Sequence, residues 1–217
     1  MSKAISIVIV GRSSGKSGLA HVFAKKKYNF DDATPTHGFN TFTQNISFEE
    51  DEDPVKITVM DTSGLGKERP DIIGYVQKSD ATVVVFDLTN KNNFEDIAKK
   101  WCDDVCAAVA SQGSGKFFLL VGNKIDKDGR KVTAEEANNF VSALQKKGAN
   151  FSCMDYKETS GIADPSGARK MFLDLARKIA EKRGYCKVQK KTQEVALSST
   201  PDGTSAVTPR DSCCVVS

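Results

Sequence analysis

The chain has 217 residues, 39% of them hydrophobic and 27% charged, which is typical of a folded globular protein and excludes a disordered or fibrous one. Its 31 basic and 28 acidic side chains leave a net charge of +3, too small to hold the protein on nucleic acid by charge alone. No apolar run approaches the ~18 residues that a membrane-spanning helix requires, so we expect no integral membrane protein.

Six strands are expected in chain order. Residues 5–10 form an apolar run that ends at a glycine, which predicts a buried first strand, and helical character follows over 17–27. The other strands are predicted at residues 39–48, 55–60, 82–86, 117–121 and 153–156. We expect the strand at 55–60 to pair back on the strand at 39–48 as an antiparallel neighbour.

Between and after these strands, apolar residues repeat at helical spacing. One helical face carries Phe94, Ile97, Ala98, Trp101, Val105 and Val109, a second carries Ala137, Phe140, Val141 and Leu144, and the final helix carries Ala168, Met171, Phe172, Leu175 and Ile179. Thr133 with Glu136 has the pattern of a capping box, and Asp164 before Pro165 predicts another helix start.

Strands that alternate with helices predict an α/β fold. We expect a mostly parallel six-stranded sheet with one antiparallel edge strand and with helices on both faces. After residue 183 the helical periodicity stops and polar residues dominate. The sequence therefore predicts one domain over residues 1–183 and a flexible C-terminal tail over 184–217.

Two of the predicted strands are followed by residues suited to phosphate and metal. Residues 11–17, Gly-Arg-Ser-Ser-Gly-Lys-Ser, open a helix after the first strand, where backbone N–H groups can meet a phosphate chain. Lys16 would reach the terminal phosphates, and the Ser17 hydroxyl would bind Mg²⁺. After the third strand, Asp61 can hold the metal through water, and the N–H of Gly64 can contact a γ-phosphate.

Two later strands are followed by residues suited to a guanine base. Asp126, in the run Asn-Lys-Ile-Asp at 123–126, can accept two hydrogen bonds from the guanine ring N–H and amino group, a donor pair that adenine lacks. After the sixth strand, backbone N–H groups of 158–161 could donate to the base carbonyl, and Ser160 could brace Asp126. In open α/β sheets, ligands bind beyond the carboxyl ends of the strands, which is where all four clusters fall.

In this order the four clusters resemble the motifs of a small GTPase of the Ras superfamily, most like the Rab family, over residues 4–183. Phe94 followed by Trp101 is also similar to Rab proteins. The resemblance implies a single P-loop NTPase domain that binds GTP or GDP with Mg²⁺ and hydrolyses GTP. The nucleotide contacts that it implies are Ser13, Ser14, Gly15, Lys16, Ser17, Gly18, Tyr28, Thr36, Gly64, Asn123, Lys124, Asp126, Ser160, Gly161 and Ile162.

The resemblance also places switch I at 34–38 and switch II at 61–64, through which the family meets effectors, an exchange factor and an activating protein. Thr36 would be the second direct Mg²⁺ ligand in the triphosphate state, beside Ser17, although Thr34 and Thr41 are close enough to compete. Tyr28 stands where the family has an aromatic ring against the base. The alternative is a surface aromatic at the end of a helix.

Two positions depart from the family pattern. The usual phosphate loop has four residues between its glycines, whereas Gly11 and Gly15 enclose three, so either the loop is one residue shorter or Val10 occupies the place of the first glycine. Leu65 stands where the family has a catalytic glutamine that orients water. We therefore expect slow GTP hydrolysis. The alternative is a pseudo-GTPase scaffold, nucleotide-bound or nucleotide-free, without meaningful turnover.

The chain ends Cys213-Cys214-Val-Val-Ser, which has the form of a prenylation box and is similar to Rab tails that carry two lipids. Whether one or two chains are attached, and whether they are farnesyl or geranylgeranyl, stays open. These cysteines predict a cytoplasmic protein held peripherally on the cytosolic face of a membrane, with a prenyl-carrier protein as a partner. We expect a monomer with a role in vesicle trafficking and no nucleic-acid partner.

Overall fold

The computed structural model describes residues 3–29, 36–50, 53–64, 69–97, 101–110, 115–147 and 151–188. The chain divides into two units, residues 1–186 and 187–217, and the fold below is that of the first. Its strands are β1 (Ala4–Val10), β2 (Phe39–Ile46), β3 (Val55–Thr62), β4 (Ala81–Asp87), β5 (Phe117–Asn123) and β6 (Cys153–Thr159).

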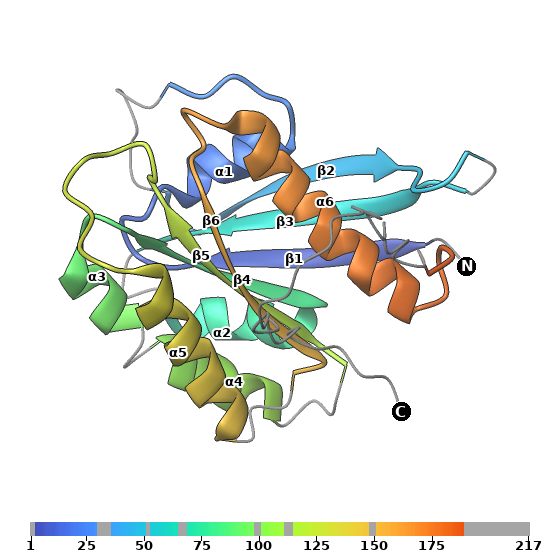
Figure 1. Ribbon diagram of the computed structural model, residues 1–217. Coiled ribbons are helices and arrows are strands. Elements are labelled where there is room, and N and C mark those ends of the chain that lie inside the picture. The colour runs from blue at the N-terminus through green and yellow to red at the C-terminus, as the bar shows by residue number, and fades with distance from the viewer. Residues whose placement is uncertain are drawn as a thin grey trace, which may run out of the picture. The chain divides into compact units, whose positions relative to one another are not determined.

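The six strands form one sheet in the order β2-β3-β1-β4-β5-β6 (Figure 1). β2 and β3 pair antiparallel, with Phe42 opposite Val59, and the other described pairings are parallel. This confirms the predicted α/β fold with one antiparallel edge strand. Since parallel strands have their carboxyl ends at the same end of the sheet, the loops after β1, β3, β5 and β6 meet there.

The helices are α1 (Lys16–Phe23), α2 (Arg69–Lys78), α3 (Lys91–Asp96), α4 (Cys102–Ala110), α5 (Ala134–Lys146) and α6 (Pro165–Lys182). Both predicted caps are present: Thr133 and Glu136 form a complete capping box, and an Asp164 carboxylate oxygen accepts from the Gly167 N–H at 2.8 Å. Helix α1 is shorter than predicted because Lys25, with φ 56°, takes the left-handed conformation that ends many helices.

The apolar face predicted between residues 94 and 109 falls on α3 and α4, and Ile97 and Trp101 between them are also helical. Residues 98–100 lie outside the described part. Phe94, Ile97, Trp101 and Val105 are nevertheless buried in one cluster, as their spacing predicts. Helix α2 was not predicted, since among its apolar side chains over residues 71–78 only Ile72 and Val76 are buried, and its sequence shows little periodicity.

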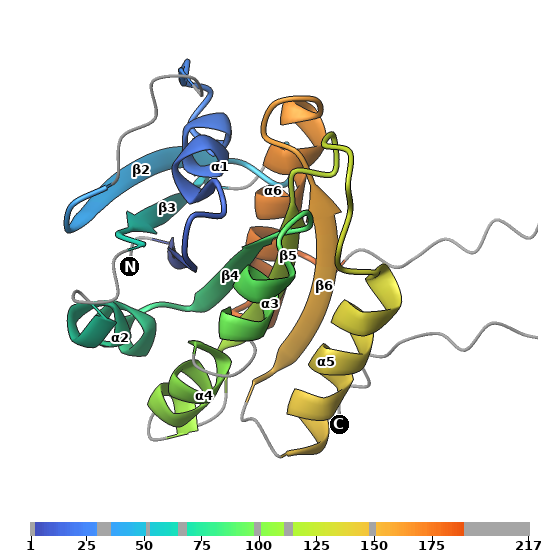
Figure 2. The same ribbon diagram turned by 90° about the vertical axis from the view of Figure 1, so that its left-hand side faces the viewer.

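Helices cover both faces of the sheet, which divides the core into two clusters. On one face, Ile5, Ile7 and Ile9 of β1 pack with residues of α1 and α6, which lie side by side in Figure 1. On the other face, Val8 and Val10 pack with α2, α4 and α5, and Figure 2 shows α5 running alongside β6. No helix in the described ranges is long and apolar enough to cross a membrane.

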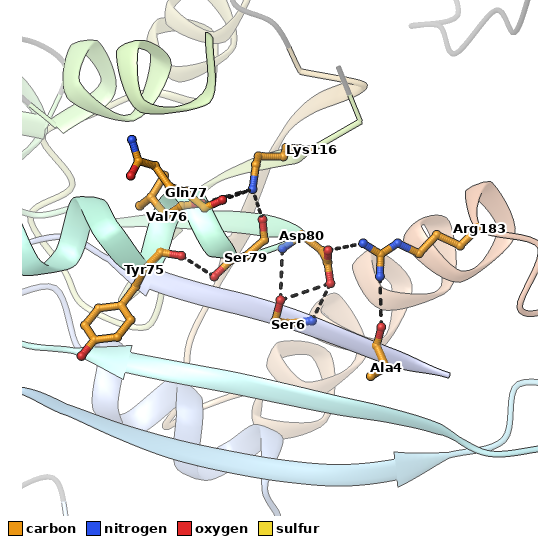
Figure 3. Close-up of polar contacts among 9 residues, drawn as sticks. All are labelled: Ala4, Ser6, Tyr75, Val76, Gln77, Ser79, Asp80, Lys116 and Arg183. Atoms are coloured by element: carbon orange, nitrogen blue, oxygen red, sulfur yellow. Dashed lines mark hydrogen bonds and ion pairs between the residues drawn. The ribbon is translucent and has the colours of Figure 1, made fainter. Parts of the chain in front are cut away.

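The C-terminal end of α2 is anchored near the amino-terminal ends of β4 and β5, at the end of the sheet opposite the four loops (Figure 3). The ammonium group of Lys116 donates to the carbonyl of Gln77 at 2.7 Å, and also to those of Val76 and Ser79. The carbonyls of Val76 and Gln77 lie in the last turn of α2, where a helix supplies too few N–H donors of its own, and that of Ser79 follows directly after it. Asp80 follows, accepts from the N–H of Ser6 at 2.8 Å and pairs with Arg183 near the end of α6.

We expect Lys116→Met to lower the free energy of unfolding by about 1–3 kcal/mol, because it removes a charged donor from the last carbonyls of α2. Methionine keeps the apolar part of the side chain, so the loss reports the hydrogen bonds. Urea unfolding followed by circular dichroism measures it. Lys78→Met is the matched control, since Lys78 is exposed in the last turn of α2. Equal effects of the two substitutions would contradict the anchoring role of Lys116.

Candidate functional site

A cavity of about 470 Å³ opens where the four loops meet. It is lined by Arg12, Ser13, Ser14, Gly15, Lys16, Ser17, Tyr28, Thr36, Gly64, Asn123, Lys124, Asp126, Lys127, Ser160, Gly161 and Ile162. Every residue that we expected to contact the nucleotide is in this set except Gly18, which is buried in α1. Residues predicted from four separate motifs therefore surround one space.

Some expected residues lie elsewhere. Asp61 is fully buried and does not line the cavity, but it contacts Thr36, which does. Leu65, Cys213 and Cys214 fall outside the described residues. Arg12 and Lys127 also line the cavity but were not predicted to do so. The available signal was their position, since each is a basic residue inside or directly beside a predicted motif.

The phosphate loop runs from the end of β1 to α1 and depends on two glycines with positive φ. A Cβ atom on Gly11, with φ 136°, would lie 2.2 Å from the Val85 carbonyl oxygen. One on Gly15, with φ 83°, would lie 2.6 Å from Nδ2 of Asn123. Any larger residue at either position would push the loop off its neighbours.

Helix α1 begins at the cavity without a side-chain cap. Its N-cap residue is Gly15, and no acidic side chain lies in its first turn. The first N–H groups of a helix have no partner within it and carry partial positive charge. The start of α1 is therefore suited to an anion such as a phosphate group.

Lys16 and Asp61 form a buried pair of opposite charges beside the phosphate loop. Burial lowers the pKa of Lys16, and the nearby Asp61 carboxylate opposes this. Burial raises the pKa of Asp61, which hydrogen bonds from Ser17 and Thr36 and the charge of Lys16 oppose. The ammonium group of Lys16 donates to the Gly11 carbonyl at 2.9 Å, so the lysine lies along the loop and not away from it.

Three oxygen-bearing side chains converge next to this pair. The hydroxyls of Ser17 and Thr36 are 3.0 Å apart, and the Thr36 hydroxyl donates to Oδ2 of Asp61 at 3.3 Å. The other Asp61 carboxylate oxygen is buried and has no hydrogen-bond partner among the described residues. Hydroxyl and carboxylate oxygens are ligands that Mg²⁺ prefers, so these three side chains fit that ion.

Of the threonines that could compete for the metal, Thr36 is the one in contact with Ser17 and Asp61. Thr41 is exposed on β2, opposite Met60. Thr34 lies outside the described residues. The positions of Thr36 and Thr41 therefore favour Thr36 as the metal ligand.

At the other end of the cavity, two of the predicted base contacts are held by the protein itself. Nδ2 of Asn123 donates to the Ser14 carbonyl at 2.7 Å, which joins the loop after β5 to the phosphate loop. The ammonium group of Lys124 pairs with Asp87 at 2.7 Å. Burial raises the pKa of Asp87, but hydrogen bonds from Lys124 and Thr89 outweigh it and leave that pKa lowered.

The carboxyl group of Asp126 is exposed at the cavity wall. The Ser160 hydroxyl, which we expected to brace it, accepts instead from the N–H groups of Ile162 at 3.1 Å and Ala163 at 2.9 Å. Ser160 thus shapes the loop after β6. Neither of these two contacts involves Asp126, and the base-binding role of Asp126 remains a prediction.

Tyr28 lies at the mouth of the cavity beside α1. Its ring centroid is 4.7 Å from that of His21, whose Nδ1 is 2.8 Å from the Ser17 carbonyl oxygen. Burial raises the pKa of the Tyr28 phenol, and a hydrogen bond with the Ser17 side chain opposes the rise. Tyr28 is thus packed against α1, which carries Ser17, and its stacking on a base stays a prediction.

Comparison with known proteins gives a consistent picture of what the chain is similar to. The model of the Ras family matches residues 6–181. The chain is 30% identical over 209 residues to the Ras-related protein Rab-1 of Theileria annulata, covering 95% of this chain and 88% of that protein. It is 31% identical over 218 residues to human Ras-related protein Rab-39A, covering 95% and 94%. The chain is 30% identical over 137 residues to mouse Ras-related protein Rab-7b, and this match covers 63% of this chain and 67% of that protein.

Proposed function

This chain belongs to the Ras family as a divergent Rab-like small GTPase, and we propose that it is a guanine-nucleotide-dependent switch in membrane trafficking that hydrolyses GTP slowly. The observation that carries the proposal is the convergence of all four motif loops on one cavity, with a phosphate loop at one end and Asp126 at the other. A cavity built this way fits a purine nucleoside with a phosphate chain.

In the proposed reaction, water attacks the γ-phosphorus of GTP, its bond to the β–γ bridging oxygen breaks, and GDP and inorganic phosphate are formed. Lys16 neutralises charge on the terminal phosphates, and the N–H of Gly64 donates to the γ-phosphate. Ser17, Thr36 and Asp61 would hold Mg²⁺, Asp61 through water. When bound, the ion supplies positive charge to the phosphate oxygens. Thr36 and Gly64 belong to the two segments that would contact the γ-phosphate, so its loss would release both segments.

The direct test is to measure the nucleotide that the native protein carries. We expect freshly purified protein to release bound GDP or GTP on denaturation, as identified by chromatography. We also expect it to bind both guanine nucleotides and to release phosphate from GTP over hours. Protein that is empty and refuses millimolar guanine nucleotide would contradict the proposal.

A second candidate function is a scaffold that binds partners without meaningful turnover. The presence of Leu65 in the water-orienting position favours it, because leucine has neither a donor nor an acceptor. The glycine spacing of the phosphate loop favours it too, since a shorter loop could lose an N–H to phosphate. Nucleotide affinity without phosphate release would support this scaffold over the switch.

We expect Leu65→Gln to accelerate single-turnover GTP hydrolysis by about 10- to 100-fold, because a glutamine amide can orient the attacking water. Phosphate release from preloaded protein, with no activating protein present, measures the rate. Leu65→Met is the matched control, since methionine changes the shape of the side chain but adds no amide. If glutamine gives no acceleration, Leu65 is not what limits hydrolysis.

We also propose that effectors, an exchange factor and an activating protein bind through the two switch segments, and that the C-terminal tail holds the protein on the cytosolic face of a membrane. The proposal for the tail rests on the two adjacent cysteines, Cys213 and Cys214, in a prenylation box. A prenyl-carrier protein would then shield the lipid away from the membrane. Two chains anchor stably, whereas one binds marginally.

We expect intact-mass spectrometry of the protein from its native cells to show added lipid on the tail. Cys213→Ser and Cys214→Ser should each remove one lipid if both cysteines are modified. The matched control is Cys186→Ser, which removes a buried thiol outside the tail motif. An unmodified native mass would contradict the membrane anchor but not the nucleotide-dependent switch.

A further inference from the structure

Asn93 is a buried polar residue of α3 that the sequence reasoning did not connect to the cavity. It is 9% exposed. Its Nδ2 donates to the Arg12 carbonyl of the phosphate loop at 2.6 Å, and its Oδ1 accepts from the Asp87 N–H at 2.9 Å. Because a backbone N–H can only donate, Oδ1 must face Asp87, and Nδ2 must face Arg12. Both ends of the amide are therefore engaged and its orientation is determined.

The backbone of Asn93 is held as well, which makes the amide a rigid support. The N–H of Asn93 donates to Oδ1 of its helix cap, Asn90, at 3.0 Å. Asp87, the other partner of the Asn93 amide, receives Lys124 on its carboxylate. Asn93 thus joins the phosphate loop to the end of β4 and, through the Asp87 carboxylate and Lys124, to the loop that follows β5.

A phosphate-binding loop needs such support because its N–H groups must face the ligand. In a trans peptide the C=O points opposite to the N–H, so each inward N–H leaves a carbonyl pointing into the protein. The Ser14 carbonyl is met in this way by Asn123, whereas the Gly11 carbonyl oxygen faces Lys16 near Gly64. Asn93 meets the carbonyl of Arg12, and so it determines the direction of the next N–H, that of Ser13.

Ser13 is the loop residue that most needs this constraint. Its φ of 49° is left-handed, which residues other than glycine rarely adopt. Such a conformation persists only where the surroundings hold it. Since φ of Ser13 is the rotation next to the Arg12–Ser13 peptide, a donor on the Arg12 carbonyl holds that rotation directly.

The amide nitrogen of Ser13 lies at the phosphate end of the cavity. A Cβ atom placed on Gly64 would lie 3.3 Å from Nζ of Lys16, 3.4 Å from the Gly11 carbonyl oxygen and 3.5 Å from the amide nitrogen of Ser13. The Ser13 nitrogen, the Lys16 ammonium and Gly64 therefore surround one spot. Under the proposed function, Lys16 and Gly64 contact the terminal phosphate, which GDP lacks.

We propose that Asn93 is a positioning residue that holds the Ser13 N–H toward the terminal phosphate and thereby raises the preference for GTP over GDP. This inference rests on the proposed guanine-nucleotide function. Asn93 touches no nucleotide itself. A residue that only stabilised the fold would support both nucleotides equally, so the ratio of the two affinities distinguishes the roles.

The test compares Asn93→Asp with the native chain at pH 8. Aspartate has the size of asparagine and can still accept from the Asp87 N–H, but its ionised carboxylate cannot donate to the Arg12 carbonyl. We expect affinity for a non-hydrolysable GTP analogue to fall about tenfold more than affinity for GDP, from the loss of one buried hydrogen bond. Asn92→Asp is the matched control, because it makes the same chemical change at an exposed position one residue earlier.

A ratio of affinities that changes less than twofold in Asn93→Asp, or that changes equally in Asn92→Asp, would overturn the inference. Thermal unfolding checks that the variants are folded. A second measurement needs no variant: in the native protein, the Ser13 amide should exchange its hydrogen more slowly with the GTP analogue than with GDP. Equal exchange would overturn the inference. Native protein that binds neither nucleotide would instead overturn the proposed function, and this inference with it.

Discussion

Asp126→Asn is expected to shift the base preference from guanine to xanthine by a factor of about 10⁴. The proposed role of the carboxylate is to accept two hydrogen bonds, from the ring N–H and the amino group of guanine. An asparagine amide presents one of its N–H groups where guanine also has a donor, so one pair becomes repulsive. Xanthine has a carbonyl oxygen in place of the amino group and can accept from the amide.

Competition binding with GDP and xanthosine diphosphate measures this shift. Asp128→Asn is the matched control, because Asp128 is an exposed carboxylate two residues further along the same loop and does not line the cavity. The control should leave the preference for guanine unchanged. If Asp126→Asn also leaves it unchanged, the assignment of residues 123–126 to base recognition is wrong, although the phosphate end of the site would still stand.

Lys16→Ala is expected to weaken the affinity for GDP and GTP together by about a thousandfold. Lys16 is 6% exposed, donates to the Gly11 carbonyl and lies near buried Asp61, so its loss affects three features at once. The phosphates lose a positive charge, the loop loses a hydrogen bond, and the Asp61 carboxylate loses the cation that opposes its burial. Titration with fluorescent nucleotide measures the loss.

Lys27→Ala is the matched control, since it removes the same charge from an exposed position after α1. It should change affinity little, because exposed charges are screened by solvent and salt. Thermal unfolding of both variants without nucleotide separates a loss of binding from a loss of fold. A folded Lys16→Ala protein with native affinity would show that the cavity holds phosphate in another way, or does not hold it.

Local chemistry explains why much of the fold and of the candidate site could be predicted from the sequence. The capping box at Thr133, the cap at Asp164 and the apolar run of β1 involve residues within a few positions of one another. A motif that follows a strand is also placed by a local rule, since its loop must lie at that strand's carboxyl end. The parallel sheet then brought four such motifs to one cavity.

The features of the fold that the sequence did not predict have physical reasons as well. Helix α2 gave little sequence signal because it buries few apolar residues, and its end is anchored by Lys116 from far along the chain. The apolar face expected over residues 94–109 is shared by α3 and α4, which both turn it to the core.

The order of the strands, the starts of α5 and α6 and the four motif loops were therefore available from the amino acids alone, because each depends on neighbouring residues. The contact between Asn93 and the Arg12 carbonyl, the choice of Thr36 beside Asp61, and the partners of Ser160 and Lys116 came only from the folded molecule. Asn93 and Arg12 are 81 positions apart. Hydrogen bonds between such distant groups depend on how strands pair and helices pack, and no local pattern encodes their distance or direction.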